Sequence, residues 1–415
     1  MRTAVRFPAL TALVLAARLL AAQSLSPLTL DDALATALRQ NPDLRTARLR
    51  VDSSRADVRI ARSYTNPTLA IAPSNPWQYS IAAPLDVGPQ RTYRVRTAND
   101  GAFAAEHDTR DTERTVRFAV RAAFYDLLLA DTLRAITREQ HDIFRDLLAA
   151  DSARVRAGDM PERNLVKSEL ELAKSEADLS RADASVRAAR LALQAAMGVT
   201  RPDTGVRVTG SLAVQPRDSV AALAAVPGLS FAPNDSTLSL RPDVKAARAR
   251  TQASEDARRF ASALLVPVPE LMLVQQRDEP FPNGQHYAIG VGAQLPVWNW
   301  FSGERARADA SVKQSQIAEE RVRVQAFAEV TAAVDQLLAA EQLARKLDTR
   351  LLDKARLSLE TARFAYAAGA ISYVELLDAV RTYGEIRAQA AAAGHDYWVS
   401  AYAVVRALDH EGRQP

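Results

Sequence analysis

The sequence predicts a mainly α-helical protein with a small β part, built as a tandem repeat. Three observations support this fold class. The chain has 415 residues with only 15 Gly and 6% aromatic residues, and it is rich in Ala, Leu and Arg, a composition typical of long helices. Its two halves contain the same motifs in the same order. Each half also includes short segments in which apolar and polar residues alternate.

The composition excludes several kinds of site. The chain has no Cys, so disulfides, thiolate metal ligands and Cys nucleophiles are impossible. Its five His are scattered and it has only four Met, so we expect no metal site and no cofactor. The 53 basic and 49 acidic residues are mixed along the chain, which indicates solvated helix faces and no nucleic-acid partner.

The first residues have the layout of a secretory signal peptide. Arg2 and Arg6 precede an apolar stretch that ends in small residues around Ala21 and Ala22, so we predict a signal peptide over 1–22. No later run approaches the roughly 18–20 apolar residues of a membrane helix. We therefore expect an exported protein without a transmembrane helix.

The repeat defines the domain organisation. "NPDLRTARLR" (41–50) matches "RPDVKAARAR" (241–250), and "RVRAGDMPERNLVKSELE" (154–171) matches "RFAYAAGAISYVELLDAVRT" (363–382), each about 200–210 residues later. The predicted domains are a first repeat over 23–200, a linker over 201–240, a second repeat over 241–410 and a tail over 411–415.

Each repeat should begin with a helix. In the first repeat this helix runs from about Leu30 to Arg62 with a break at Pro42, because proline ends or kinks a helix. Long helices are expected over roughly 104–156 and 304–367, on the order of 80–95 Å in length.

Two glycines predict the turns of helical hairpins. Return helices are expected over 159–198 and 370–409. Gly158 and Gly369 stand before them, where glycine can adopt the left-handed conformation of a helix C-cap without a side-chain clash.

The alternating segments "QYSIAAPLDV" (78–87) and "HYAIGVGAQLPV" (286–297) predict strands with one bulky apolar face and one small or polar face. Such strands also occur in half-buried sheets of soluble domains, and this alternative stays open. Against it, an isolated strand pair between helices is marginal in water. Near the strand ends lie aromatic residues typical of membrane interfaces, namely Trp77, Tyr79, Tyr287, Trp298, Trp300 and Phe301. Each repeat should contain two such short segments, which makes four strands in the chain. Four strands cannot close a transmembrane barrel, which needs about eight, so several chains would have to contribute.

Polar residues share one face of the second return helix, beginning with Glu375 and Asp378. The corresponding stripe of the first repeat begins with Asn164 and Lys167. A stripe of this kind usually lies on a solvated outer face. Because this one recurs in both repeats and starts beside a hairpin turn, we favour a position on the wet inside of a hollow helical bundle.

These motifs together resemble the TolC-type outer membrane efflux factors, nearest the branch that serves heavy-metal and cation exporters. The likeness runs from "LTLDDALATALRQNPDL" (28–44), through "LPVWNWFSGERARADAS" (295–311), to "AAGAISYVELLDAVRT" (367–382), and covers nearly the whole mature chain. The resemblance implies a homotrimer in outer membrane lipid, in which each chain lends four strands to a twelve-stranded transmembrane β-barrel continued by an α-helical tunnel in the periplasm. It implies a passive efflux duct that is not an enzyme and that docks to a periplasmic adaptor and an inner-membrane pump, RND-type or similar.

The resemblance also assigns roles to residues. In the family, carboxylates just after the second turn glycine form the narrowest ring of the closed tunnel, and by position these are Glu375 and Asp378. Asn164 and Lys167 occupy the matching positions of the first repeat, and we hypothesise that Lys167 pairs with the acidic ring. A basic residue often found after the turn glycine in the family is absent here. Adaptor docking is expected at the hairpin turns, at Gly158, Asp159, Gly369, Ala370 and Ile371.

Two other functions fit parts of the sequence. A periplasmic adaptor is also exported and also contains a helical hairpin, but it would need β-rich domains flanking one hairpin, whereas this chain has two hairpins in tandem. An enzyme would need a substrate pocket, a nucleophile or a phosphate loop beside Glu375 and Asp378, and the sequence contains no such motif.

Overall fold

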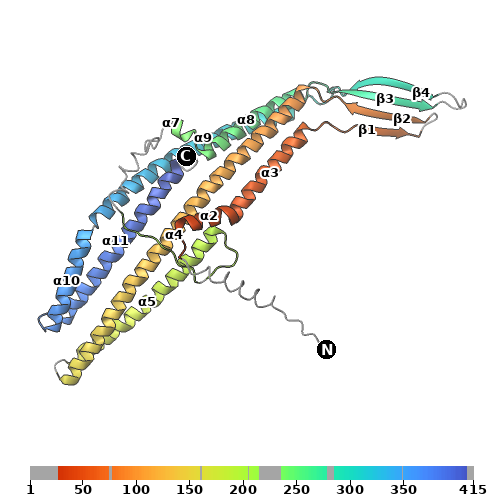
Figure 1. The fold of residues 1–415 in the computed structure, drawn as a ribbon. Helices are drawn as coiled ribbons and strands as arrows, with labels where there is room; N and C mark the ends of the chain where they lie inside the picture. The colour runs from red at the N-terminus through yellow and green to blue at the C-terminus, as the bar shows by residue number, and fades with distance from the viewer. Residues whose placement is uncertain are drawn as a thin grey trace, which may run out of the picture. The chain divides into compact units, whose positions relative to one another are not determined.

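The structure, a computed structural model, describes residues 27–73, 77–158, 161–203, 205–214, 235–277, 285–347 and 349–408. The predicted signal peptide, the predicted tail and Asp159 lie outside these residues. Helices make up most of the described chain, and four short strands form one sheet (Figure 1). The mainly helical fold class with a small β part is therefore confirmed.

In chain order, the described elements are α2 (Leu30–Gln40), α3 (Pro42–Arg62), β1 (Thr68–Ala72), β2 (Gln78–Pro84), α4 (Pro89–Ala157), α5 (Glu162–Met197), α7 (Asp235–Leu238), α8 (Pro242–Ala263), β3 (Pro269–Arg277), β4 (Gln285–Ala293), α9 (Ser302–Lys346), α10 (Thr349–Ala367) and α11 (Tyr373–Leu408).

The chain forms two compact units. We call the first the hairpin unit; it comprises Met1–Pro42, Arg114–Phe231 and Val330–Pro415. We call the second the sheet unit; it comprises Asp43–Glu113 and Ala232–Glu329. Helices α4 and α9 each contribute one part to each unit.

Most of the predicted helices are present, with two differences. The break at Pro42 is confirmed, because α2 ends at Gln40 and α3 begins at Pro42. Helix α4 begins at Pro89, about four turns before the expected start at 104. Proline is favoured in the first turn of a helix, where its missing N–H is not needed.

The second long helix is divided. Residues 304–367 were expected to form one helix, but α9 ends at Lys346 and α10 begins at Thr349. The sequence at this point reads Leu-Asp-Thr, and Asp and Thr favour the start of a helix over its interior.

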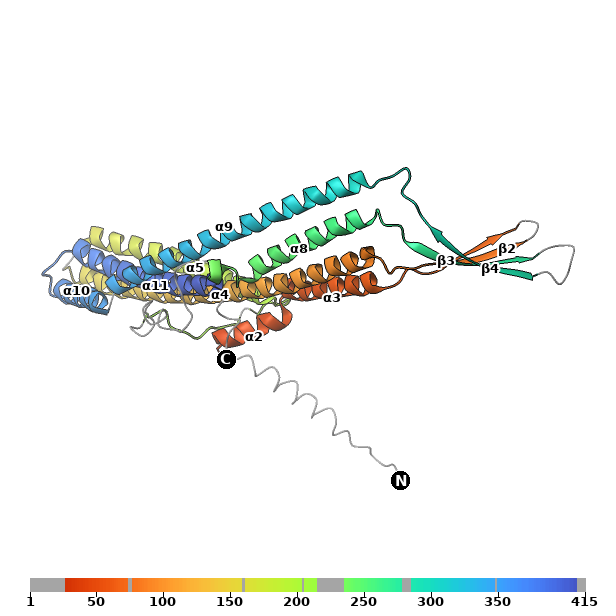
Figure 2. The same cartoon turned by 90° about the horizontal axis from the view of Figure 1, so that it is seen from above.

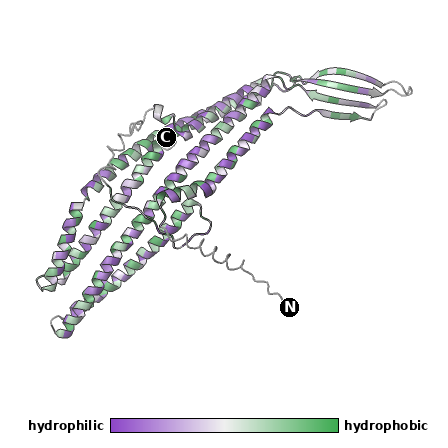
Figure 3. Ribbon diagram, viewed as in Figure 1, coloured by the Kyte–Doolittle hydropathy of each residue, from purple (hydrophilic) through white to green (hydrophobic). Residues whose placement is uncertain are grey.

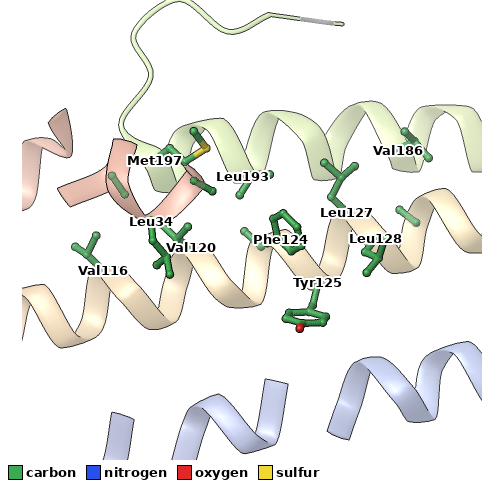
Figure 4. Packing of buried hydrophobic residues seen from close by; sticks show 14 residues of the cluster. Leu34, Val116, Val120, Phe124, Tyr125, Leu127, Leu128, Val186, Leu193 and Met197 are labelled. Atoms are coloured by element: carbon green, nitrogen blue, oxygen red, sulfur yellow. The ribbon is translucent and has the colours of Figure 1, made fainter. Parts of the chain in front are cut away.

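Two hairpins of helices make up most of the hairpin unit. Figures 1 and 2 show α5 running back along α4, and α11 running back along α10. One apolar cluster joins α2, α4 and α5, with Leu34, Phe124, Leu127, Leu193 and Met197 among its buried side chains (Figure 4). Burying a side chain of this size stabilises the fold by roughly 1.5–3 kcal/mol, so this cluster anchors the first hairpin to α2.

A second apolar cluster joins the two hairpins nearer their turns. It contains Phe144 and Leu147 of α4, Leu359 of α10, and Leu376 and Val380 of α11. All five side chains are buried, so α4 packs against both helices of the second hairpin.

The end of α5 packs tightly against the break between α2 and α3. Gly198 caps α5 with φ +77°, and a Cβ added there would lie 2.7 Å from Cα of Asn41. The side-chain amide of Asn41 donates to the carbonyl of Ala196 at 2.9 Å. Only glycine provides both the left-handed conformation and the space for this approach.

The sheet of the sheet unit is an antiparallel meander in the order β1-β2-β3-β4. Its register places Leu69 opposite Ile81, Ile81 opposite Leu273, and Leu273 opposite Ile289, so these residues form one row on one face. The neighbouring row, on the other face, contains Ala82, Met272 and Gly290. The predicted alternation of faces is confirmed for β2 and β4. Figure 3 shows the apolar residues of the strands in green.

Side chains from the first turns of α4 connect the sheet to the helices. The amide of Gln90 donates to the carbonyl of Ala263, the last residue of α8, at 2.8 Å and to that of Val266, just after the helix, at 2.6 Å. Arg94 donates to the carbonyl of Ala61 in α3 and to the carboxylate of Asp86 after β2. Because carbonyls at helix ends have no partner within the helix, these contacts stabilise the chain where it enters and leaves the strands.

Candidate functional site

The turns of the two hairpins have the predicted backbone conformation. Gly158 and Gly369 have φ values of +81° and +73°, and nothing lies within 4 Å of a Cβ added at either position. After α10, the N–H of Gly369 donates to Tyr366 at 3.0 Å and the N–H of Ala370 donates to Ala365 at 2.8 Å. This is the double hydrogen-bond pattern of a Schellman cap, which ends a helix and reverses the chain.

Glu375 lies at the start of the second return helix and caps it. Its carboxylate accepts a hydrogen bond from the N–H of Ser372 at 2.7 Å, and the hydroxyl of Ser372 accepts one from the N–H of Glu375 at 3.3 Å. This reciprocal arrangement is a capping box. The motif was visible in the sequence as Ser followed three residues later by Glu, and our sequence reading missed it.

The other residues of the two polar stripes are separated from one another. Asp378 and Lys167 are exposed, and Asn164 is half-buried. Within the described part of one chain, Lys167 and Asp378 form no ion pair. The hypothesis that Lys167 pairs with the acidic ring therefore stays a prediction for the assembled protein.

A different ion pair joins the two return helices. Arg381 of α11 and Glu171 of α5 lie 2.8 Å apart. Glu171 follows Lys167 at +4 and so continues the predicted polar stripe of the first repeat. Arg381 lies outside the stripe predicted for the second repeat, so this pair joins the return helices through only one of the two stripes.

A buried carboxylate forms the centre of the contact between the hairpins. Asp151 of α4 has no exposed surface, and it accepts hydrogen bonds from the hydroxyl of Ser168 in α5 at 2.5 Å and from the hydroxyl of Tyr366 in α10 at 2.8 Å. Arg154 adds a hydrogen bond to the carbonyl of Ala367 at 2.8 Å. Asp151 and Arg154 lie one to two turns before Gly158, and Tyr366 lies about one turn before Gly369.

Burial, together with the hydrogen bond to Asp151, raises the pKa of Tyr366. The phenol therefore keeps its proton and remains a donor through the ordinary pH range. The sequence reading missed Asp151, although Phe144, Leu147 and Asp151 share one helix face, so that an acid stands in an otherwise apolar stripe.

The predicted interface aromatics are exposed in the sheet unit. Trp298 is 95% exposed, and Tyr287 and Trp300 are 64% exposed. Trp77 and Tyr79 stack with ring centroids 6.5 Å apart. Large apolar rings and a row of exposed aliphatic side chains therefore occur together on this unit.

Neither a metal site nor a membrane-spanning helix is found in the described part of the chain. Its His, Asp and Glu residues do not gather into groups of three or more that could hold a metal ion. None of its helices combines the length and the apolar character that crossing a membrane requires.

Comparison with known proteins gives one family. The model of the family described as "Outer membrane efflux protein" matches residues 33–199 and 235–409. The cobalt-zinc-cadmium resistance protein CzcC of Cupriavidus metallidurans is 25% identical over 374 residues, which cover 88% of this chain and 86% of that protein.

Solved structures of outer membrane channels share the fold. The CmeC outer membrane channel of Campylobacter jejuni matches with a TM-score of 0.78 at 16% identity, covering 91% of this chain and 85% of that one. CusC, a protein solved in a study of transmembrane channel formation, matches with a TM-score of 0.75 at 20% identity, covering 91% of each chain.

Proposed function

Since this chain belongs to the outer membrane efflux protein family, it is an outer membrane duct for efflux, and we propose that three copies of it assemble into one channel that docks to a periplasmic adaptor and an inner-membrane pump. The pump is expected to be of the RND type or similar. The alternative reading, that the chain is itself the periplasmic adaptor, is not favoured by these matches.

The observation that supports the trimer is the sheet. Strands β1 and β4 are its two edges, so each leaves a row of backbone N–H and C=O groups without partners in the sheet. In a membrane such groups must be paired within protein, because lipid offers no hydrogen bonds. Four strands are too few to close on themselves, whereas three copies would supply a closed barrel of twelve.

The two faces of the sheet carry different kinds of side chain. Leu69, Ile289 and Val291 on this face are 63%, 78% and 75% exposed in the single chain. The opposite face carries mostly small or polar residues, such as Ser80, Ala82 and Gly290, together with Met272. We propose that the apolar face meets lipid and the small-residue face lines the pore, as in other transmembrane barrels.

We propose the same domain boundaries as before: a signal peptide over 1–22, repeats over 23–200 and 241–410, a linker over 201–240 and a tail over 411–415. The two separate family matches, over 33–199 and 235–409, support a division of this kind.

The proposed gate lies where the hairpins end. Threefold symmetry would bring three copies of Asp378 together on the exposed face of α11, and like charges in a ring attract cations. Glu375, Asn164 and Lys167 lie on the same turns of the return helices. The two turns at Gly158 and Gly369–Ile371 are proposed as the docking surface for the adaptor, together with Asp159.

The cargo follows from the curated relative. CzcC is named for resistance to cobalt, zinc and cadmium. We propose that divalent metal cations are among the substrates that this duct conducts, with selection made by the partner pump and not by the duct.

One experiment tests the assembly. The full chain is expressed with its export signal, extracted from the outer membrane in mild detergent, and examined by native mass spectrometry and in planar bilayers. The expected result is a trimer of the 45.2 kDa chain, less the signal peptide, that conducts ions. A monomer that is soluble without detergent, or an adaptor-like protein that never conducts, would refute the proposal.

The cargo needs a separate test. The gene is deleted in a host that carries its adaptor and pump, and zinc and cobalt tolerance is measured before and after complementation. Tolerance that falls on deletion and returns on complementation supports metal export. Unchanged tolerance would remove metals from the cargo while leaving the duct in place.

A further inference from the structure

A histidine is held between two carboxylates where the two hairpins meet. His395 lies on α11, and its side chain is only 14% exposed. Its Nε2 lies 2.8 Å from Oδ1 of Asp126 on α4, and its Nδ1 lies 3.0 Å from Oδ1 of Asp396, the next residue along α11. One bond therefore crosses between the hairpins, and the other orients the ring.

This geometry suits only the protonated ring. A neutral imidazole donates from one nitrogen and accepts at the other, whereas an imidazolium donates from both. An ionised carboxylate can only accept hydrogen bonds. In a neutral ring, the nitrogen without a proton would therefore turn its lone pair toward a carboxylate oxygen. The hydrogen bond to Asp126 raises the pKa of His395, and the bond to Asp396 adds to it, while burial acts in the opposite sense.

The surroundings of the ring add no further charge that would oppose this. The segment 210–214 passes α11 at Gly394, the residue before His395, because a Cβ added at Gly394 would meet the carbonyl oxygen of Leu212. That segment, Gly-Ser-Leu-Ala-Val, has no titratable side chain.

Several charges on neighbouring elements are paired with one another. Arg387 of α11 pairs with Glu139 of α4, and Arg134 of α4 pairs with Asp183 of α5. On α9, Glu341 and Arg345 pair at 2.6 Å along the helix, and both line the cavity that Gly394 also lines. Asp353 and Arg356 of α10 line the same cavity, and Arg356 pairs with Glu360.

We propose that Asp126, His395 and Asp396 form a pH-sensitive clasp that holds α11 against α4 while the ring is protonated and weakens when the proton is lost. The clasp regulates the duct, so its effect on conduction rests on the proposed function. Loss of the proton removes one of two hydrogen bonds and the attraction between ring and carboxylates, and so favours separation of the hairpins.

The direction of the pH effect follows from the raised pKa. The stabilisation is fully present below the ordinary His value of 6.5, and it is lost as pH rises through the higher value in the folded protein. The hairpins should therefore be held most firmly below pH 6.5 and released as the pH rises through the higher folded-state pKa of His395.

His141, another histidine in the described part of the chain, provides a control. His141 lies on α4 of the same unit, and the polar atom facing its Nδ1 is the hydroxyl of Ser175 at 3.1 Å. With no carboxylate bonded to its ring, it should not act as a clasp. His141→Gln is therefore a matched control for His395→Gln.

Two measurements on the full-length protein test the clasp. The first is the histidine titration by NMR of selectively labelled protein in detergent, with His395→Gln used to assign the signal. The midpoint of His395 should lie above 6.5 and fall in Asp126→Asn, because the hydrogen bond to Asp126 is the largest cause that raises this pKa. A midpoint at or below 6.5, or one unmoved by Asp126→Asn, would overturn the proposal.

The second measurement is resting conductance in planar bilayers, titrated from below pH 6.5 upward through the midpoint that the NMR titration gives for His395. Wild type and His141→Gln should conduct more at the alkaline end, and His395→Gln should lose this step. Open channels with the same pH profile in wild type and His395→Gln would refute the clasp. Absence of channels in every variant would refute the proposed duct, and the NMR titration would then decide on the clasp.

Discussion

The hydroxyl of Tyr366 donates a hydrogen bond to Oδ1 of Asp151 at 2.8 Å, and this bond ties the second helical hairpin to the first. Asp151 has no exposed surface, and its other oxygen accepts a hydrogen bond from Ser168. A buried carboxylate is tolerated only while donors satisfy it, so removing one donor leaves an unsatisfied oxygen in the core. The contact between the two hairpins therefore becomes destabilising when a donor to Asp151 is removed.

Replacing Tyr366 by Phe should loosen the hairpins. The change keeps the ring but removes the donor, at an expected loss of about 1–3 kcal/mol. We expect a lower temperature of thermal unfolding and a larger resting conductance in planar bilayers. Tyr383→Phe is the control, because the Tyr383 hydroxyl bonds to no described residue while its ring lies 5.2 Å from the Arg387 guanidinium. Wild-type behaviour of Tyr366→Phe in both measurements would contradict this role.

In the described part of the chain, three glycines have positive φ, and they should respond differently to alanine. Gly158→Ala and Gly369→Ala should each cost about 1 kcal/mol, because the left-handed conformation is strained but the space is open. Gly198→Ala should cost about 1–3 kcal/mol more, since its Cβ would also press on the backbone of Asn41.

Thermal unfolding of the purified variants measures these differences. Gly101→Ala serves as the control, because Gly101 lies inside α4 with nothing within 4 Å of an added Cβ. It should stabilise the helix by about 0.5–1 kcal/mol. If Gly198→Ala is no worse than Gly369→Ala, the close approach of α5 to Asn41 is not tight in solution.

The two carboxylates after the second turn should have separable roles. Asp378→Asn should weaken block by multivalent cations, if Asp378 contributes to a ring in the pore. Glu375→Gln should change block less, because the Glu375 carboxylate is engaged with Ser372 and the amide oxygen can replace it. Glu375→Ala should instead lower stability by about 0.5–2 kcal/mol through loss of the cap.

Conductance and cation block in planar bilayers distinguish these cases. Strong loss of block in Glu375→Gln would mean that the capping bond opens in the assembled channel. Cation block that is unchanged in Asp378→Asn, and also in the variant that combines it with Glu375→Gln, would place both acids on the outer solvent face. Lys167→Ala should raise resting conductance only if Lys167 pairs with the ring between chains.

The two faces of the sheet should tolerate charge differently. Ile289→Lys places a charge on the apolar face, where contact with lipid would make it cost about 2–4 kcal/mol near the middle of the membrane. Ala288→Lys places the same charge on the opposite face and is the matched control.

The readout is the amount of heat-resistant trimer in the outer membrane fraction. We expect Ile289→Lys to reduce it strongly and Ala288→Lys to leave most of it. Equal loss in both variants would show that the apolar face is not the one that meets lipid.

Several features were readable from the sequence because they depend on neighbouring residues. The proline at 42 limits the backbone conformation, and the structure has a helix break there. The glycines at 158 and 369 extend the conformations available, and the structure has a turn at each. The period-two alternation of the strands likewise placed Ile81 and Ile289 on one face before their partners were known. The capping box of Ser372 and Glu375 was equally local, and a closer reading would have found it.

The sequence by itself determined the order of helices, strands and turns and the repeat of that order, because each depends on conformational preferences and periodicity within a few residues. Only the tertiary structure decided that Asp151 is buried beneath Tyr366 and that His395 faces Asp126. An acid or a histidine on a helix is solvated or enclosed according to the helix that packs against it, and here the two partners are separated by more than 200 residues of chain. The pairing of distant surfaces thus sets the charge and hydrogen bonding of these groups, and local sequence carries no record of it.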